Sequence, residues 1–305
     1  MAIDTVKVIV NGTTVTAVDN GDGTYTAVLV APNVTSYNVN SGHYYPVTIV
    51  ATNMAGTSTT VNDTHSTLGS YLKLRVKETS APTITISTPT SGQYLSTASP
   101  QIKFTVTDEP NGSGVAISTL KIIVDGTTYT NTSDVVNVTS ITNGYSVICT
   151  PTALKDGSHS VSIQVSDNDG NNATSSTINF ITDTVAPILS VTNPSANNTY
   201  VSNSALTVVG TTSDSTSGIP TIKITLNGVD QGNVTVSNGA FSKAITLVNG
   251  SNTIVVTATD KAGKTTTVTR TVVLDTSVPV VASVVINPNP VNVGANYTVT
   301  IEVTE

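Results

Sequence analysis

Residues 254–263, with the sequence IVVTATDKAG, alternate between apolar and polar side chains and end in a turn sequence. A period of two places every second side chain on one face of a strand, and Asp-x-x-Gly is typical of a turn that ends in a left-handed glycine. The stretch therefore predicts a strand with one buried face, closed by a tight turn. Residues 47–56 (VTIVATNMAG) and 161–170 (VSIQVSDNDG) repeat this pattern.

A second repeated signal precedes each of these strands. It is an apolar strand that runs into Asn-Gly or Asp-Gly, in residues 6–12 (VKVIVNG), 120–126 (LKIIVDG) and 222–228 (IKITLNG). Such dipeptides favour a type I′ hairpin turn, in which both central residues have positive φ. The glycines of the two signals are 44 residues apart in the first two copies and 35 apart in the third. The chain is therefore built from repeats of one unit.

Proline-containing joints separate the repeats. They are residues 79–82 (TSAP), 184–187 (TVAP) and 276–279 (TSVP), each preceded by an acidic residue, Glu78, Asp183 or Asp275. Proline biases the residue before it toward extended geometry and is found at strand starts and sheet edges. The joint prolines are 105 and 92 residues apart, about the length of one β-sandwich module. We predict a first module at 1–78, a second at 79–183, a third at 184–275, and a further opening strand pair at 276–305.

The composition favours an all-β fold. Charged residues make up 10% of the 305 residues, tryptophan is absent, and there is one cysteine. Serine, threonine and asparagine compete for backbone hydrogen bonds in helices, whereas β-branched residues suit strands. Turn signals that recur about every 8 to 12 residues between short alternating segments indicate a sandwich.

Two stretches resemble a known family. Residues 250–263 (GSNTIVVTATDKAG) with 274–279 (LDTSVP) are similar to the bacterial Ig-like repeats of cell-surface proteins and bacteriophage tail proteins, and residues 167–171 with 183–187 are similar in the same way. The resemblance covers the second and third modules well, and the first from its mid-domain strand onward. It implies tandem immunoglobulin-like β-sandwich modules; the short joints would make them a semi-rigid rod. The cysteine pair and core tryptophan of antibody domains are absent.

The first and last pieces are incomplete in a complementary way. The first module begins at the strand that the other modules place well after their joint proline, so it lacks two opening strands. Residues 280–286 and the alternating Tyr297, Val299, Ile301 and Val303 would supply such a pair. The simpler interpretation is a truncated further repeat beside a self-sufficient first module. The alternative is head-to-tail self-association, in which residues 279–305 complete the first module of the next chain.

Several acidic stretches raise the question of calcium. Residues 19–23 (DNGDG) and 167–170 (DNDG) place oxygen ligands close together, and Asp108, Glu109 and Asp183 could lie near a joint. The same residue types are required by tight turns, and no full EF-hand pattern is present. The sequence therefore predicts no metal-binding residues and leaves calcium at the joints open.

The remaining candidates for chemistry are few. His43, His65 and His159 lack zinc-ligand spacing and are expected on the surface or in turns. Ser158-His159-Ser160 has no nucleophile elbow beside it. Cys149 is expected to be a small buried side chain. The adjacent Tyr44 and Tyr45 favour packing over a platform for a sugar or protein partner. We predict no catalytic and no cofactor-binding residues, and hence no enzyme.

The charge and the hydropathy of the chain disfavour two classes of function, nucleic-acid binding and membrane insertion. The net charge of −7 and the pI of about 4.8 disfavour nucleic-acid binding, and the longest apolar runs, of about five residues, are too short to insert into a membrane. The resemblance implies a structural or attachment protein of a phage or phage-tail-like particle, in the tail or baseplate. Its partners would be other structural proteins and a host-surface glycan or protein. The alternative is a stalk or adhesin of a bacterial cell surface. A strand directly after Met1, with no signal peptide, favours the virion.

Overall fold

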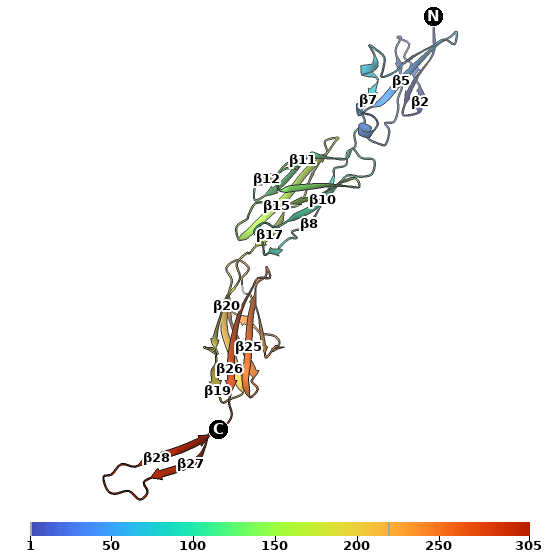
Figure 1. Cartoon of the computed structure of the whole chain (residues 1–305). Coiled ribbons are helices and arrows are strands. Elements are labelled where there is room, and N and C mark those ends of the chain that lie inside the picture. The colour runs from blue at the N-terminus through green and yellow to red at the C-terminus, as the bar shows by residue number, and fades with distance from the viewer. Residues whose placement is uncertain (1, 219) are drawn as a thin grey trace. The chain divides into compact units, whose positions relative to one another are not determined.

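The computed structural model describes residues 2–218 and 220–305 (Figure 1). Met1, on which the expectation about the signal peptide depended, and Ile219 lie outside the described residues. The chain divides into two compact units, residues 1–182 and 183–305. Strands dominate both, and the helical elements are the short 3-10 helices η1 (Ser36–Asn38) and η2 (Gly69–Tyr71). No helix in the described ranges is long and apolar enough to cross a membrane.

The second module is a sandwich of two sheets. One sheet has the strand order β13-β14-β10-β8, and the other has the order β12-β11-β15-β17-β9 with β16 paired to β15. The bounds are β8 Thr83–Thr88, β9 Tyr94–Leu95, β10 Ile102–Thr107, β11 Val115–Val124, β12 Thr127–Tyr129, β13 Val136–Ile141, β14 Gly144–Cys149, β15 Gly157–Asp167, β16 Asn172–Thr174 and β17 Ile178–Thr182.

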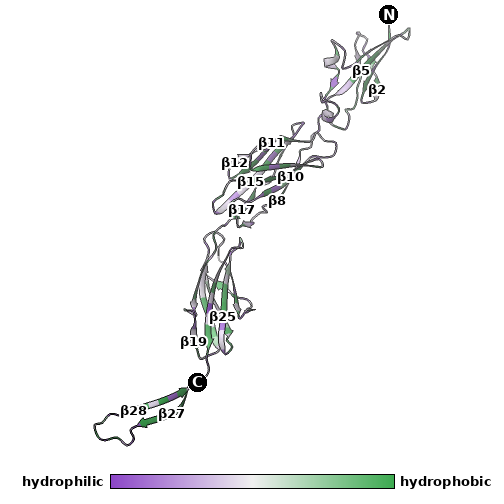
Figure 2. Ribbon diagram, in the orientation of Figure 1, coloured by the Kyte–Doolittle hydropathy of each residue, from purple (hydrophilic) through white to green (hydrophobic). Residues whose placement is uncertain are grey.

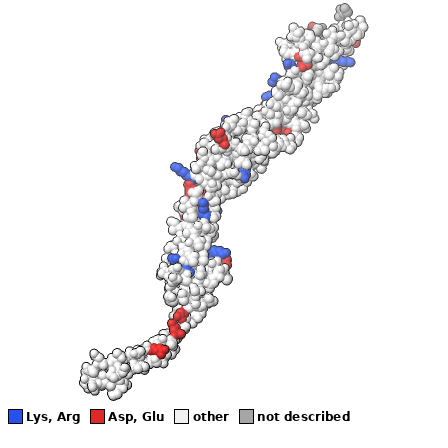
Figure 3. Space-filling model, in the orientation of Figure 1, with Lys and Arg blue, Asp and Glu red and all other residues white. Residues whose placement is uncertain are grey.

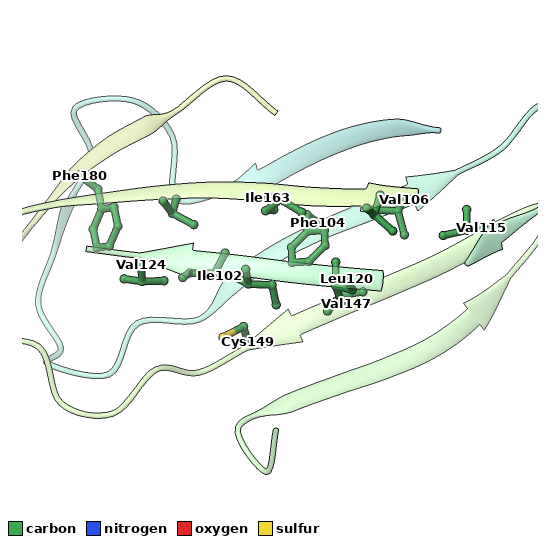
Figure 4. Close-up of a cluster of buried hydrophobic side chains, with 13 residues drawn as sticks. Ile102, Phe104, Val106, Val115, Leu120, Val124, Val147, Cys149, Ile163 and Phe180 are labelled. Carbon is green, nitrogen blue, oxygen red and sulfur yellow. The ribbon is translucent and has the colours of Figure 1, made fainter. Parts of the chain in front are cut away.

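The core of this module lies between its two sheets, because alternate residues of the strands point inward. Figure 4 shows these side chains meeting between the strands. The buried residues are Ile102, Phe104, Val106, Val115, Leu120, Ile122, Val124, Val147, Cys149, Val161, Ile163, Val165 and Phe180. The expectation that Cys149 is a buried small side chain is confirmed.

The first module has one main sheet, of order β2-β1-β5-β6, with β7 paired to β5. Strands β3 and β4 form a separate two-stranded ladder. The bounds are β1 Ile3–Val10, β2 Thr13–Thr16, β3 Val18–Asp19, β4 Tyr25–Thr26, β5 Tyr45–Asn53, β6 Ser58–Val61 and β7 Lys73–Leu74. Among the described residues of this module, the buried apolar side chains are Val10 and Tyr45. The second layer of a sandwich is therefore largely missing here.

The third module, in the second unit, is again a sandwich. Its sheets have the orders β18-β20-β24-β23 and β19-β26-β25-β21-β22, and its core includes Val208, Ile224, Phe241 and Val256. The bounds are β18 Ile188–Asn193, β19 Thr199–Val201, β20 Ala205–Ser213, β21 Thr221–Leu226, β22 Val229–Asp230, β23 Val236–Ser237, β24 Ala240–Thr246, β25 Gly250–Thr259 and β26 Thr265–Leu274.

The C-terminal residues form one antiparallel hairpin of β27 (Val280–Asn287) and β28 (Thr298–Thr304). Every residue from 280 to 305 is exposed. The two strands match the ones expected at 280–286 and at the alternating residues 297–303.

The turns follow the sequence signals. The hairpin residues Asn11, Asp125 and Asn227 have φ between 47° and 50°, and the glycine after each is also left-handed. These values confirm the expected hairpin turns. Each sheet in the described ranges uses strands of only one predicted module, and the module boundaries themselves stay a prediction.

Candidate functional site

The hairpin of β27 and β28 exposes the apolar side chains that a sandwich would bury. Val281 and Val284 are 59% and 55% exposed, and Ile301 and Val303 are 56% and 57% exposed. Figure 2 shows hydrophobic residues along both strands. Single exposed apolar residues are normal on a protein surface, but a contiguous set marks an interaction site.

The hairpin corresponds to the opening strands of the complete modules. In the second module β8 pairs antiparallel with β10, and in the third β18 pairs in the same way with β20. Each first strand, like β27, ends directly before a proline, namely Pro89, Pro194 or Pro288. The hairpin thus has the form of a first and second strand without the rest of a module.

The first module presents an apolar groove where its second layer would be. The groove has a volume of about 300 Å³ and is lined by Val8, Val10, Leu29, Val30, Ala31, Val47 and Leu74. Strands β1 and β5, which provide three of these residues, correspond to β11 and β15 of the second module. There, the same strand pair is covered by the sheet that contains β8 and β10.

One segment beside the groove alternates like a strand but is not paired. Residues 27–30 belong to no strand, although Ala27 and Leu29 are half-buried and Val28 and Val30 are 85% and 95% exposed. The segment follows Tyr25, much as β14 of the second module begins around Tyr145. Strand β14 pairs with β10 along its whole length. Residues 2–78, as the structure describes them, include no strand in the place of β10.

Three carboxylates come together in the first unit. Oxygens of Glu78, Asp108 and Glu109 lie within 4.8 Å of one another. Glu78 follows the last strand of the first module and is held by the second: its N–H donates to Asp169 (3.1 Å), and its Oε1 accepts from the N–H of Ser113. Asp108 directly follows β10, and its Oδ2 accepts from the N–H of Gly114 at 2.6 Å.

The close approach changes the acidity of this cluster. Burial, followed by the contact with Glu109, raises the pKa of Glu78 to about 7. Burial is also the main cause of the raised pKa of Asp108. The hydrogen bond with Glu78 lowers the pKa of Glu109 to about 2. The three groups therefore share protons and do not titrate as separate carboxyls.

A second cluster lies within the second unit. Oxygens of Asp183, Asp214 and Asp260 lie within 4.8 Å of one another. Asp214 follows β20 and accepts hydrogen bonds from the N–H and the hydroxyl of Ser217, which lower its pKa despite burial. Burial raises the pKa of Asp183. Carboxylate oxygens at this separation are close enough to share one cation.

The acidic stretches identified from sequence have mixed outcomes. Asp19 and Asp22 accept from the backbone N–H groups of Gly21 and Thr24, so residues 19–23 form a plain turn. Asp167 likewise accepts from backbone N–H groups within its turn. Asp108, Glu109 and Asp183 do belong to clusters. The sequence analysis did not predict that Asp214, Asp260 and Glu78 belong to these clusters. The sequence does contain a pattern that indicates them, because acidic residues recur before the joints and at the ends of equivalent strands.

His159 is buried, with 8% of its surface exposed, and does not lie in a turn or on the surface as expected. It sits within β15, where Nδ1 is 2.6 Å from Oδ2 of Asp125 and Nε2 is 2.8 Å from the carbonyl oxygen of Lys155. Both ring nitrogens thus face acceptors. The nearby hydroxyl of Thr182 is fully buried and donates to the same carbonyl. The arrangement connects β15 and β17 to the turn after β11 and to the loop that contains Lys155.

The other candidates take part in local packing. His43 stacks on Tyr37 with ring centroids 4.1 Å apart, and Nδ1 of His65 accepts from the N–H of Leu68 at 3.3 Å. Tyr45 is buried and Tyr44 donates its hydroxyl to Asp63 at 2.9 Å. These contacts agree with packing roles. On the face shown in Figure 3, charged side chains are scattered over a mostly uncharged surface.

The comparisons with known proteins match the observed fold. Residues 95–184 match the family model of a bacterial Ig-like domain, and residues 187–276 match that of glucodextranase domain B. None of the curated proteins matches the chain significantly.

Solved structures show distant likeness. The fibronectin(III)-like modules of CbhA from Clostridium thermocellum are 19% identical, with 63% of this chain and 94% of that one covered and a TM-score of 0.41. A structure of a bacterial ice-binding adhesin, described for its host cell surface retention, is 22% identical, with 89% and 86% covered and a TM-score of 0.32. Scores this low decide nothing about function. The sheet topology and the family matches together identify the chain as a series of Ig-like β-sandwich repeats, of which the second matches the bacterial Ig-like domain.

Proposed function

We propose that the chain is a non-enzymatic structural protein that joins end to end with a second copy of itself. Ig-like modules are typically non-catalytic, and the described residues offer two apolar surfaces. One is the exposed hairpin of β27 and β28, and the other is the apolar groove of the first module. The single observation that carries the proposal is that the hairpin has the form of the strand pair that the first module lacks.

The second module serves as a template for the joint. Its sheet order is β13-β14-β10-β8, so β28 of one copy would take the place of β10 and β27 the place of β8. Strand β28 would then pair with residues 27–30 of the other copy, which alternate correctly but belong to no strand. Adding a strand to an open edge supplies main-chain hydrogen bonds, and alternate side chains fill the groove.

Such a joint is heterologous, because two different surfaces meet. A heterologous contact that does not close into a ring propagates as an open chain of subunits. The proposed role follows from this property. The complete modules act as spacers, and the sandwich completed at each joint connects one copy to the next. Each apolar side chain that passes from water into the joint contributes about 1.5–3 kcal/mol.

We assign this role to a phage or phage-tail-like particle, in the tail or baseplate, with other structural proteins and a host-surface glycan or protein as further partners. The support is the resemblance of the repeats to those of phage tail proteins. Mass spectrometry of purified particles and of surface-shaved cells tests the setting. Recovery from the cell surface alone would replace the virion by the bacterial stalk or adhesin and leave the structural role intact.

Molar mass in solution tests the joint itself. Light scattering over a concentration series should show the full chain growing beyond a monomer, whereas a chain without residues 279–305 stays monomeric. Ile301→Asp, on the apolar face of β28, should abolish growth. Thr300→Asp, on the opposite face of the same strand, is the matched control and should retain it. A monomer at every concentration for the full chain would overturn self-association.

Hydrogen exchange locates the contact. On association the amides of residues 27–30 should become protected, because they would then pair with β28. Growth without protection there would mean that the hairpins meet each other and not the first module, which also overturns the proposal.

A further inference from the structure

We infer that the two carboxylate clusters are calcium sites, one formed by Glu78, Asp108 and Glu109 and the other by Asp183, Asp214 and Asp260. The inference is independent of the end-to-end joint. It rests on four observations, which concern the position of the clusters in the modules, their unpaired oxygens, their spacing, and the close approach of the backbone to the first cluster.

The clusters occupy the same place in two modules. Glu78 and Asp183 are the acids that precede the proline joints, and Asp108 and Asp214 directly follow the equivalent strands β10 and β20. The third module adds Asp260, which follows β25. Independent recurrence of acids at equivalent positions is not required by turn geometry, because residues 19–23 build an acidic turn with no such cluster.

One substitution explains why the third ligand differs. Asp167, the equivalent of Asp260, uses Oδ1 for its turn, and its Oδ2 accepts from the side-chain amide of Asn171 at 2.7 Å. Lys264 stands in place of Asn171 in the third module. Asp260 still accepts from the N–H of Lys264 at 2.8 Å through Oδ1, and its Oδ2 is left for the cluster. In the second module Glu109 provides the third carboxylate.

The clusters hold buried oxygens that make no hydrogen bond. These are Oδ2 of Asp183 and of Asp260 in one cluster, and Oδ1 of Asp108 and Oε2 of Glu78 in the other. Asp183 is 0% exposed, and Asp108 and Asp260 are each 7% exposed. Burying a carboxylate without a partner is unfavourable. Two clusters with unpaired buried oxygens at equivalent positions point to one kind of missing partner, and a bound cation would neutralise the carboxylates of both.

The spacing suits calcium. Two oxygens that bind one Ca²⁺ at about 2.3–2.6 Å lie no more than about 5 Å apart, and the three carboxylates of each cluster meet this limit of separation. Each of the three carboxylates offers at least one of the six to eight oxygens that Ca²⁺ takes, whereas Mg²⁺ requires a smaller, near-octahedral site.

The backbone passes close to the first cluster at Gly112. A Cβ atom at Gly112 would lie 2.7 Å from Oδ2 of Asp108 and 2.8 Å from Oε2 of Glu78. Gly112 therefore lets the loop pass close to the carboxylates without filling the space between them.

Calorimetric titration of the full chain with CaCl2 tests the inference. Wild type should bind two ions per chain, and Asp260→Asn and Glu109→Gln should each bind one. Asp275→Asn is the matched control, because Asp275 is also an acid before a joint proline and accepts from Ser277 N–H at 2.9 Å, yet it belongs to neither cluster. It should bind two ions.

Thermal unfolding provides a readout that a purely structural role would not move. Five millimolar CaCl2 should raise the melting temperature of wild type relative to EDTA by roughly 5 °C. Without calcium, Asp260→Asn should melt at or above wild type, because it relieves repulsion between like charges, and it should lose the calcium response of the third module. A variant that melts lower in EDTA and keeps the full response would overturn the site. Saturation of wild type by MgCl2 at equal concentration, or no binding of either ion, would overturn the assignment to calcium.

Discussion

In strand β10 of the second module and in strand β28 at the end of the chain, apolar and polar residues alternate in the same way. The apolar side chains of β10 are buried, whereas those of β28 are exposed. Ile102, Phe104 and Val106 are at most 2% exposed. Val299 and Ile301, at the matching inward positions of β28, are 48% and 56% exposed. An alternating pattern specifies which face of a strand is to be buried. It does not supply the layer that buries it.

The same contrast holds at the strand edges. Strand β10 is paired on both sides, with β8 and β14, whereas β28 is paired only with β27. Residues 27–30 show the reverse defect, since they alternate but form no strand. A strand forms where its backbone groups find partners. Strand β28 has a partner on one side only, and residues 27–30 belong to no strand.

The largest effect should come from removing a side chain of the buried strand. Phe104→Ala deletes an aromatic ring that is 2% exposed and should cost about 3–5 kcal/mol of unfolding free energy in the second module. Urea unfolding of the intact chain, followed by hydrogen exchange of each module, measures the loss. The third module should be unaffected, and a cost under about 1 kcal/mol would show that β10 is not packed as described.

A smaller effect should come from the neighbour of β10. In Gly144→Ala the new Cβ would lie 2.0 Å from the carbonyl oxygen of Val106, so the two strands must separate. We expect a loss of about 1–3 kcal/mol from this overpacking, measured by urea unfolding. Unchanged stability would mean that the pairing of β14 with β10 is looser than that of a covered sheet.

The cluster beyond the end of β10 should make stability depend on pH in buffer free of divalent cations. Because burial raises the pKa of Glu78 from 4.5 to about 7, the folded state holds this proton more tightly than the unfolded state. The stabilisation is complete below pH 4.5 and is lost as the pH rises toward 7. The lowered pKa of Glu109, about 2, acts below this window. The melting temperature should therefore be lower at pH 7.5 than at pH 5. The difference between the two temperatures should be smaller in Glu78→Gln. A rise over the same interval would contradict the shared proton.

The smallest effect on stability should come from the exposed strand. Ile301→Ala in dilute protein should change the unfolding free energy by no more than about 0.5 kcal/mol, as for other surface positions. At high concentration it should weaken association, because Ile301 would enter the joint. A large loss of stability in the dilute monomer would show that the hairpin is already covered within one chain.

Much of the fold could be predicted from local sequence. The Asn-Gly and Asp-Gly turns, the strands before them and the pair at 280–304 all depend on nearest neighbours along the chain. The environment of His159 could not be predicted, because Asp125, Lys155 and Thr182 approach it from other parts of the fold. The carboxylate clusters could be predicted only in part: Asp108, Glu109 and Asp183 were expected near a joint. Their partners Glu78, Asp214 and Asp260 were not, because these residues meet only when a joint and the strand ends come together.

Cys149 makes the second module's unfolding detectable by thiol chemistry. It is the only cysteine of the chain, it is fully buried, and burial raises the pKa of its thiol to about 11. Thiolate is the reactive form, so the folded chain should neither cross-link under oxidation nor react with alkylating reagents. Each alkylated Cys149 then records that the second module of that chain has unfolded. The alkylated fraction measures this unfolding in a pulling or ageing experiment without any engineered label.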